Sequence, residues 1–425
     1  MRALLCVVFI VSINLCMGDT VVPAINQKLR EGVSERIGNF SIELLYYTTR
    51  LQERNTNLII SPVTVWTILA VISEGAEGNT QKEICGAIRT TPKLQTIIRN
   101  DFRNIAQYLQ VNTSTVELKK LNIMFINKKN VKEDFIERVK FYDTSALTLN
   151  FSDSNVLNKI NSAVSAFTNN KIMKLVEADD LANSEMILTS ALYFKGKWKV
   201  PFNTSSTTQL PFYNSAGKEI GKVNMMYNRY SYPFASIKQF QAKVIEIPYG
   251  KENRLSMLIM LPNEGVSLED MFQKFGNTSL DVIFEELKKS VENFSEDEVD
   301  LLLPRFKIES KIEMTETLET MDIRDLFDQA KANLPGISNL PLFVSKVIHK
   351  AVIEVSESGT EAAAVTASEF SNRIGIIRFE ANRPFCYMII EKTTNEKISV
   401  LIDFTHALNN ICMWPSMVIK TYLFK

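Results

Sequence analysis

The sequence predicts an α+β fold, with helices in the first third of the chain and large β-sheets after them. Two observations carry this prediction. Near the N-terminal end, apolar residues recur at helical spacing, as at Phe40, Leu44, Tyr47 and Leu51. Later in the chain, apolar residues instead form continuous runs of strand length.

Three segments show these patterns most clearly. A helix is predicted over residues 93–110, where one face carries Leu94, Ile98, Phe102, Ile105 and Leu109. The segment RLSMLIMLP, residues 254–262, is almost continuously apolar and ends at proline, which predicts a strand covered on both faces. The segment FCYMIIEKTTNEKISVLIDF, residues 385–404, has two apolar runs around polar residues 393–396 and predicts a hairpin.

Composition is that of an ordinary globular protein. Of the 425 residues, 45% are hydrophobic and 23% are charged, which excludes disordered and collagen-like classes. Lys plus Arg equal Asp plus Glu at 48 each, so no net field attracts the chain to nucleic acid or to an anionic membrane. No linker, repeat or low-complexity block divides the chain, and we predict a single domain over residues 19–410.

The N-terminal residues MRALLCVVFIVSINLCMGDT have the layout of a cleaved secretory signal. Arg2 is followed by an apolar run that is too short to span a membrane, and Gly18 provides a small residue for cleavage. We therefore predict a signal peptide over residues 1–18 and a secreted, extracellular protein. Six sequons support export and are candidate glycosylation sites: Asn39, Asn112, Asn150, Asn203, Asn277 and Asn293.

Cysteine usage excludes a disulfide scaffold. After removal of the signal, three cysteines remain: Cys85, Cys386 and Cys412. Because this number is odd, at least one thiol is free or pairs with another chain.

Motifs for catalysis or metal binding are missing from the sequence. It contains no G-x-S-x-G, no phosphate-binding glycine loop and no dinucleotide fingerprint. Its two histidines, His349 and His406, have no neighbours at metal-ligand spacing. His349 shares one strand face with Val347 and Ala351, and we interpret it as a core histidine that is hydrogen-bonded inside a sheet. An enzyme, a metal and a cofactor are therefore not expected, because no nucleophile and base pair is evident.

Six segments together resemble the motifs of the serpin family and occur in the family's order. They are NLIISPVT (57–64), GAEGNTQKEI (75–84), ALYFKGKWKVPF (191–202), LPRFKIES (303–310), SKVIHKAVIEVSESGTEAAAVTA (345–367) and FEANRPF (379–385). The resemblance implies the serpin fold, with three β-sheets, about nine helices and an exposed reactive-centre loop. It also implies a mechanism: a serine protease cleaves the loop, the loop inserts into the main sheet as a new strand, and the protease is trapped as a covalent acyl-enzyme.

The loop implied by the resemblance covers residues 357–379, and its first half suits insertion. Strand alternation places Thr360, Ala362, Ala364 and Thr366 on one face, and all four are small. Small side chains fit an already packed core without overpacking it. Gly359 adds a permissive backbone, and the hinge prediction also includes Glu357, Glu361 and Ala363. Taken alone, TEAAAVT would favour a helix, since alanine is the best helix former.

Family spacing predicts that the protease cleaves the bond between Arg373 and Ile374. Arg373 lies sixteen residues beyond Glu357 and eleven before the proline of FEANRPF. A guanidinium at this position suits trypsin-like proteases, whose primary pocket holds a carboxylate. Phe370 and Arg378 are rival positions. Cleavage at Phe370 would shorten the inserting segment, and cleavage at Arg378 would leave it slack.

The resemblance also assigns roles to residues of the main sheet. Glu357 and Arg305 match a pair at the breach, where the sheet opens, and Trp198 matches a residue packed nearby. Ser61 and His349 match the shutter, which lies beneath the strands that separate.

Two shutter positions depart from the family pattern. Ser190 stands where an asparagine is usual, and Thr64 stands in place of a second serine. We expect the shorter Ser190 side chain to lose a hydrogen bond to His349.

Several features are left open by the sequence. Residues 411–425 form a C-terminal extension that is too short to span a membrane. A surface for a glycosaminoglycan is a candidate feature, although charge runs are usually just solvated faces; it comprises Lys93, Arg99, Arg103, Lys119, Lys120, Lys128, Lys129 and Lys132. We expect a monomeric inhibitor whose partner is a trypsin-like serine protease. The alternative is a non-inhibitory serpin that acts as a carrier, chaperone or storage protein.

Overall fold

The computed structural model describes residues 32–52, 56–109, 111, 113–251, 254–275, 280–293, 297–357, 377–392 and 398–405. Within these ranges the strands form three sheets, of six, four and five strands. The same ranges contain ten α-helices and three short 3-10 helices. The α+β prediction with three sheets is thus confirmed.

The helices have the following bounds: α2 (Val33–Leu51), α3 (Pro62–Ser73), α4 (Gly78–Ala87), α5 (Gln95–Tyr108), α6 (Glu133–Lys140), α7 (Val156–Phe167), α8 (Ala178–Leu181), α9 (Leu268–Phe275), α10 (Leu280–Asn293) and α11 (Thr315–Thr320). The strands are β1 (Leu58–Ile60), β2 (Val116–Asn127), β3 (Thr144–Leu149), β4 (Met186–Gly196), β5 (Thr208–Tyr213), β6 (Glu219–Tyr230), β7 (Phe234–Ile237), β8 (Ala242–Tyr249), β9 (Leu255–Pro262), β10 (Val299–Pro304), β11 (Phe306–Glu313), β12 (Lys346–Val355), β13 (Ile377–Glu380), β14 (Phe385–Glu391) and β15 (Ile398–Thr405).

The five-stranded sheet has the order β11-β12-β4-β2-β3. At its centre, β12 pairs with β4 in parallel over nine consecutive residues, from Lys346 opposite Ile187 to Glu354 opposite Lys195. We call this interface the β4–β12 seam. Strands β11 and β2 pair antiparallel with β12 and β4 on either side of the seam.

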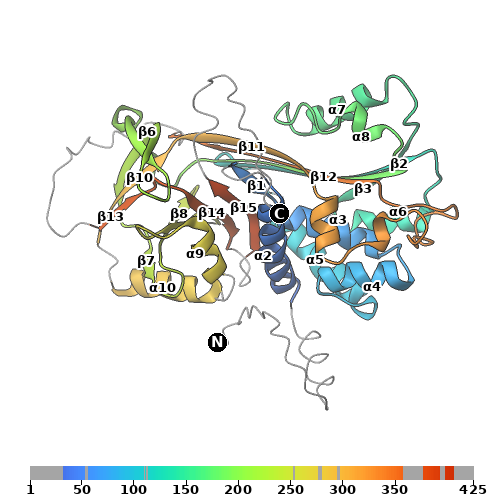
Figure 1. Cartoon of the computed structure of the whole chain (residues 1–425), viewed down its shortest axis with the longest axis horizontal. Helices are drawn as coiled ribbons and strands as arrows, with labels where there is room; N and C mark the ends of the chain where they lie inside the picture. Colours follow the sequence, from blue (N-terminus) through green and yellow to red (C-terminus); the bar gives the residue numbers. More distant parts are fainter. Residues whose placement is uncertain are drawn as a thin grey trace, which may run out of the picture.

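Helices cover both faces of this sheet (Figure 1). The long strands lie between α7 and α8 on one side and the group α3 to α6 on the other. Every residue of α3 is buried, and its apolar side chains join a core cluster with Leu188 and Val347. On the opposite face, α7 packs through Val156 and Ile160 in a second cluster that also contains Ile348. The seam is therefore enclosed by apolar side chains above and below.

The other two sheets lie mainly in the part of the molecule away from α7 and α8, with β1 and β15 near its centre (Figure 1). The six-stranded sheet has the order β1-β15-β14-β9-β8-β7, and the four-stranded sheet has the order β13-β10-β6-β5. Strand β7 is one edge strand of the six-stranded sheet, and β13 is one edge strand of the four-stranded sheet. Strand β13 follows directly after residues 358–376 and pairs in parallel with β10.

Most of the pattern-based predictions are confirmed. Strand β9 is buried along its whole length, and β14 and β15 pair antiparallel, as expected for the two arms of a hairpin. The apolar face of the helix at 93–110 is buried, although a 3-10 turn forms its first residues. Leu51 has the same helical spacing as Phe40 and Leu44 but is 39% exposed, because it is the last residue of α2.

Candidate functional site

The candidate site consists of the β4–β12 seam and the segment that leaves its end. Strand β12 ends at Val355, and Glu357 is the last described residue before the range 358–376. The remaining hinge and scissile-bond residues lie outside the described residues; they are Gly359, Thr360, Glu361, Ala362, Ala363, Ala364, Thr366, Arg373 and Ile374.

Glu357 is held in place at the end of the seam. Its side chain is buried, and its Oε1 accepts a hydrogen bond of 2.8 Å from the Thr207 hydroxyl. The predicted partner Arg305 is also present, with its guanidinium 3.5 Å from the same oxygen. The Arg305 side chain is 49% exposed, so water weakens its ion pair with Glu357. The shorter hydrogen bond from Thr207 is therefore the stronger of the two contacts. Sequence reasoning missed Thr207, which lies 150 residues away in a segment with no motif of its own.

Trp198 fixes the residue before Glu357. The indole Nε1 donates a hydrogen bond of 2.9 Å to the backbone oxygen of Ser356. Its ring stacks on Tyr249, with centroids 4.4 Å apart and planes at 13°. This packing requires a glycine at position 196, since a Cβ there would approach the Tyr249 ring to 2.4 Å. Trp198 therefore holds the backbone just before Glu357, and its role at the breach stays a prediction.

His349, which the resemblance assigns to the shutter, is fully buried in β12. Its Nε2 accepts a hydrogen bond of 2.9 Å from the backbone N–H of Ser61. The neutral ring must therefore carry its proton on Nδ1, which donates to the Ser190 hydroxyl at 2.7 Å. The structure thus confirms the interpretation of His349 as a hydrogen-bonded core histidine.

The expected loss of a hydrogen bond at Ser190 is wrong. Ser190 and His349 stand directly opposite each other in the parallel register of the seam. Adjacent strands are only about 4.8 Å apart, so a hydroxyl is long enough to reach the ring. Thr64 does not take part in this contact, because its hydroxyl donates to the Ser61 carbonyl at 2.9 Å. The shutter contact across the seam is therefore a single side-chain hydrogen bond.

Burial determines the charge of His349. Removal from water lowers the pKa of the imidazole to about 3, so the ring is neutral at pH 7. A neutral ring is what the two hydrogen bonds require, because Nε2 must remain an acceptor.

Ion pairs join the elements on both sides of the seam. Lys195 Nζ lies 2.6 Å from Glu354 Oε1, directly across the seam at the end nearest Glu357. On the face covered by α8, the Asp180 carboxylate accepts from Lys311 of β11 at 2.9 Å and from Lys346 of β12 at 3.2 Å. These two ion pairs attach α8 to β11 and β12.

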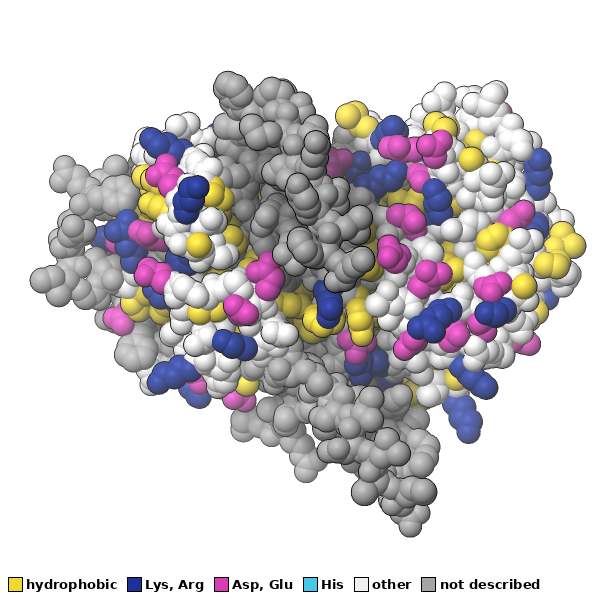
Figure 2. All heavy atoms as spheres, viewed as in Figure 1, with side chains coloured by type: hydrophobic (Ala, Val, Ile, Leu, Met, Phe, Trp, Pro, Cys, Tyr) yellow, Lys and Arg dark blue, Asp and Glu magenta, His cyan; other side chains and the backbone are white. Residues whose placement is uncertain are grey.

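The basic residues considered for glycosaminoglycan binding are partly neutralised. Arg99 donates to Glu74 at 2.6 Å, and that carboxylate is only 2% exposed, so Arg99 has a structural role. Lys120 pairs with Asp143, and Lys129 pairs with Glu185. Figure 2 shows one face of the molecule, on which acidic and basic side chains are interspersed. Glycosaminoglycan binding stays a prediction.

The candidate glycosylation sites differ in accessibility. Asn150 and Asn293 are exposed, and Asn203 is half-buried. Asn39 is buried within α2, which disfavours a glycan at this position in the folded protein. Asn112 and Asn277 lie outside the described residues.

Cys85 and Cys386 are both buried, and no disulfide joins them. Burial, aided by the charge of Glu74, raises the pKa of the Cys85 thiol to about 12. Cys85 is therefore a protonated, unreactive thiol at neutral pH. Cys412 lies outside the described residues, as does His406.

The described ranges contain neither a spanning helix nor a metal cluster. No helix in them is long and apolar enough to cross a membrane. In the same ranges, no group of three or more His, Cys, Asp or Glu side chains is arranged to hold a metal ion.

The comparisons with known proteins identify the family. The profile described as "Serpin (serine protease inhibitor)" matches residues 35–400. The chain belongs to the serpin family. It is 32% identical to Serpin B3 of Homo sapiens, over 85% of this chain and 96% of that protein. It is 30% identical to Plasminogen activator inhibitor 2 of Homo sapiens, over 80% of this chain and 91% of the relative.

Solved serpin structures share the fold. The crystal structure of serpin-12 from Manduca sexta superposes with a TM-score of 0.74 and 25% sequence identity, covering 89% of this chain and 98% of that one. A further relative, from Cyanea capillata, is named Serine protease inhibitor and is 30% identical over 80% of this chain and 89% of that protein. Serpins as a family target serine proteases.

The state of His349 predicts a pH dependence. The pKa of this ring is about 3 when folded and about 6.5 when unfolded, so the unfolded chain binds more protons between these values. The stability from this group is therefore complete above pH 6.5 and is lost as the pH falls. At pH 5.5 the loss amounts to about 1.4 kcal/mol of unfolding free energy.

Urea unfolding at pH 7.0 and 5.5 measures this loss. The variant H349Q retains a polar side chain that does not titrate, and it should lack this part of the pH dependence. Equal pH dependence in the two proteins would contradict the assignment.

Proposed function

We propose that this chain is a secreted inhibitor of trypsin-like serine proteases, which cleave it between Arg373 and Ile374 and are trapped as covalent acyl-enzymes. After cleavage, the hinge that begins at Glu357 inserts between β4 and β12. The observation that carries this proposal is the uninterrupted parallel seam, which leads directly into a segment of small alternating residues.

The strand directions supply a driving force for insertion. A segment that turns back after β12 runs antiparallel to β12. Because β4 is parallel to β12, the same segment also runs antiparallel to β4. Insertion therefore replaces one parallel interface with two antiparallel ones, and antiparallel pairing is slightly more stable per residue.

Insertion must break the backbone ladder of the seam, which the two new interfaces replace, and the side-chain contacts across it. Separation of β4 from β12 breaks the hydrogen bond between His349 and Ser190 and the ion pair between Lys195 and Glu354. Each contact of this kind stabilises by about 1 kcal/mol. The new strand must then lie between the apolar clusters of the two sheet faces, which explains why small residues at alternate hinge positions matter.

The position of Arg378 supports Arg373 as the residue that the protease recognises. Arg378 lies inside β13, opposite Asp300 in the parallel register with β10, and it forms an ion pair with Glu380. A protease would have to remove β13 from its sheet to bind this arginine in its active site. Arg373 lies within the range that precedes β13. A relative from Cyanea capillata is named Serine protease inhibitor, which supports the same activity here.

Secretion is supported by the sequence features of the N-terminus and by the sequons. Asn150 is exposed on the folded protein, where a glycan could be attached without disturbing the core.

Incubation with trypsin tests the proposal directly. We expect a complex that survives boiling in detergent, together with release of a C-terminal peptide that begins at Ile374. The variant R373A should form no such complex with trypsin, whereas R378A should form it at the normal rate. Cleavage after Arg373 without any covalent complex would refute inhibition by trapping.

A pair of hinge variants tests insertion separately from recognition. In A364E a charged side chain enters the buried face of the inserted strand, so we expect the protease to release itself and the protein to act as a substrate. In A363E the same side chain lies on the opposite face by strand alternation, where the natural Glu361 already places a carboxylate, and the covalent complex should still form. The yield of complex per cleaved molecule, read by gel, measures both. Equal yields from the two variants would contradict the assigned strand alternation.

A further inference from the structure

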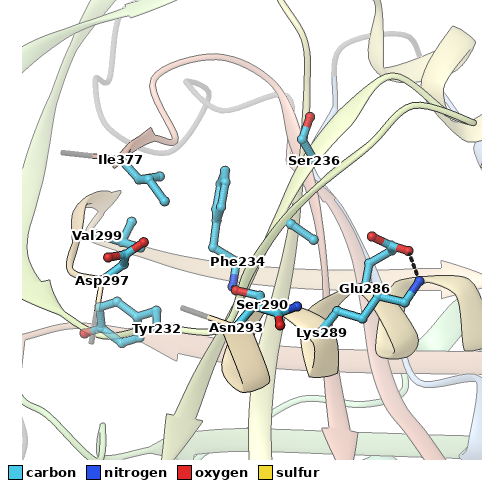
Figure 3. A pocket seen from close by; sticks show the side chains of 11 residues that line it. Tyr232, Phe234, Ser236, Glu286, Lys289, Ser290, Asn293, Asp297, Val299 and Ile377 are labelled. Carbon is cyan, nitrogen blue, oxygen red and sulfur yellow. Dashed lines mark hydrogen bonds and ion pairs between the residues drawn. The ribbon is translucent and has the colours of Figure 1, made fainter. Parts of the chain in front are cut away.

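A pocket far from the seam lies between β7, α10 and β13 (Figure 3). Its volume is about 400 Å³, which is within the range of small-ligand sites in proteins. We call it the β7–α10 pocket. In Figure 3, Tyr232, Asp297, Val299 and Ile377 lie on one side of it, and the helix α10 lies on the other.

One wall of the pocket is apolar and firmly packed. Val299, Ala235 and the ring of Tyr232 are all buried in the surrounding structure. Phe234 is held by an edge-to-face contact with Phe379, with centroids 6.3 Å apart. A flat aromatic or branched aliphatic group would find a preformed apolar surface here.

The charges of the lining select a cation. Lys289 and Glu286 form an ion pair at 2.7 Å and neutralise each other. Asp297 forms no ion pair within the described ranges, so the lining carries one uncompensated negative charge. An anionic ligand would be repelled, and a single positive charge would be matched.

Hydrogen-bonding groups in the lining favour a donor. The Tyr232 hydroxyl is buried inside the wall, so it does not reach a ligand in the pocket. The Ser290 hydroxyl already accepts from the backbone N–H of Phe234 at 3.4 Å. A protonated amine offers three donors, and the Asp297 carboxylate and the Asn293 amide oxygen are acceptors of the lining.

We propose that the β7–α10 pocket binds a small organic ammonium ion carried on an aromatic body. The ring would lie against Phe234 and Val299, and the ammonium group would pair with Asp297. This proposal is independent of protease inhibition.

Binding would reach the strand that follows the loop. Val299 and Ile377 are partners in the register between β10 and β13, and both line the pocket. A ligand that contacts both side chains stabilises the pairing of β13 with β10. It should therefore slow the hydrogen exchange of the backbone amides in residues 377–380.

Calorimetry on the intact chain tests the site with tryptamine as the cationic probe and tryptophol as its neutral analogue. We expect one tryptamine per chain and binding of tryptophol that is weaker by about tenfold or more. The variant D297N should weaken tryptamine binding by a similar factor. E298Q is the matched control, because it removes an exposed carboxylate from the next residue, which does not line the pocket.

Three calorimetric results would overturn the proposal: no binding of tryptamine at millimolar concentration, equal binding of the two probes, or unchanged affinity in D297N. Both substitutions are at exposed positions, so the variants should fold. Hydrogen exchange then locates the site. Slower exchange in residues 377–380 with tryptamine supports the pocket, and unchanged exchange there places the binding elsewhere and overturns it.

Discussion

The parallel pairing of β4 with β12 is the constraint on which the rest of this structure depends. Parallel neighbours cannot be joined by a tight turn, and here the chain between Gly196 and Lys346 builds most of the other two sheets before it returns. The strand that completes the seam is also the strand that leads into the hinge. The seam therefore connects the core of the molecule to the segment that a protease would cleave.

The native seam is stabilised by local contacts rather than by its strand pairing alone. His349 and Ser190 join the strands at the shutter, and Lys195 and Glu354 join them near the breach. Each contributes on the order of 1 kcal/mol. An inserted strand of about ten residues would add about ten backbone hydrogen bonds of similar individual value. The balance favours insertion once cleavage frees one end of the loop, which is the physical basis of the proposed trap.

The sequence predicts the parts of this structure that depend on local pattern. Continuous apolar runs identify β9 and the hairpin of β14 and β15, and family motifs identify Trp198 and His349. What it does not predict depends on distant partners. Thr207 and Glu357 lie far apart in the sequence, and only the packing of the folded chain brings them together. The contact of Ser190 depends on the exact register of two parallel strands. Leu51 has the right spacing but lies beyond the edge of the core.

The melting temperature before and after cleavage within residues 368–376 tests the central claim most directly. If the hinge inserts between β4 and β12, the cleaved protein gains a central strand, and its melting temperature should rise by on the order of 10 °C or more. Both forms contain the same residues, so composition cannot explain a difference. A melting temperature that cleavage leaves unchanged would show that the seam does not open, and would leave the chain a serpin that does not trap proteases.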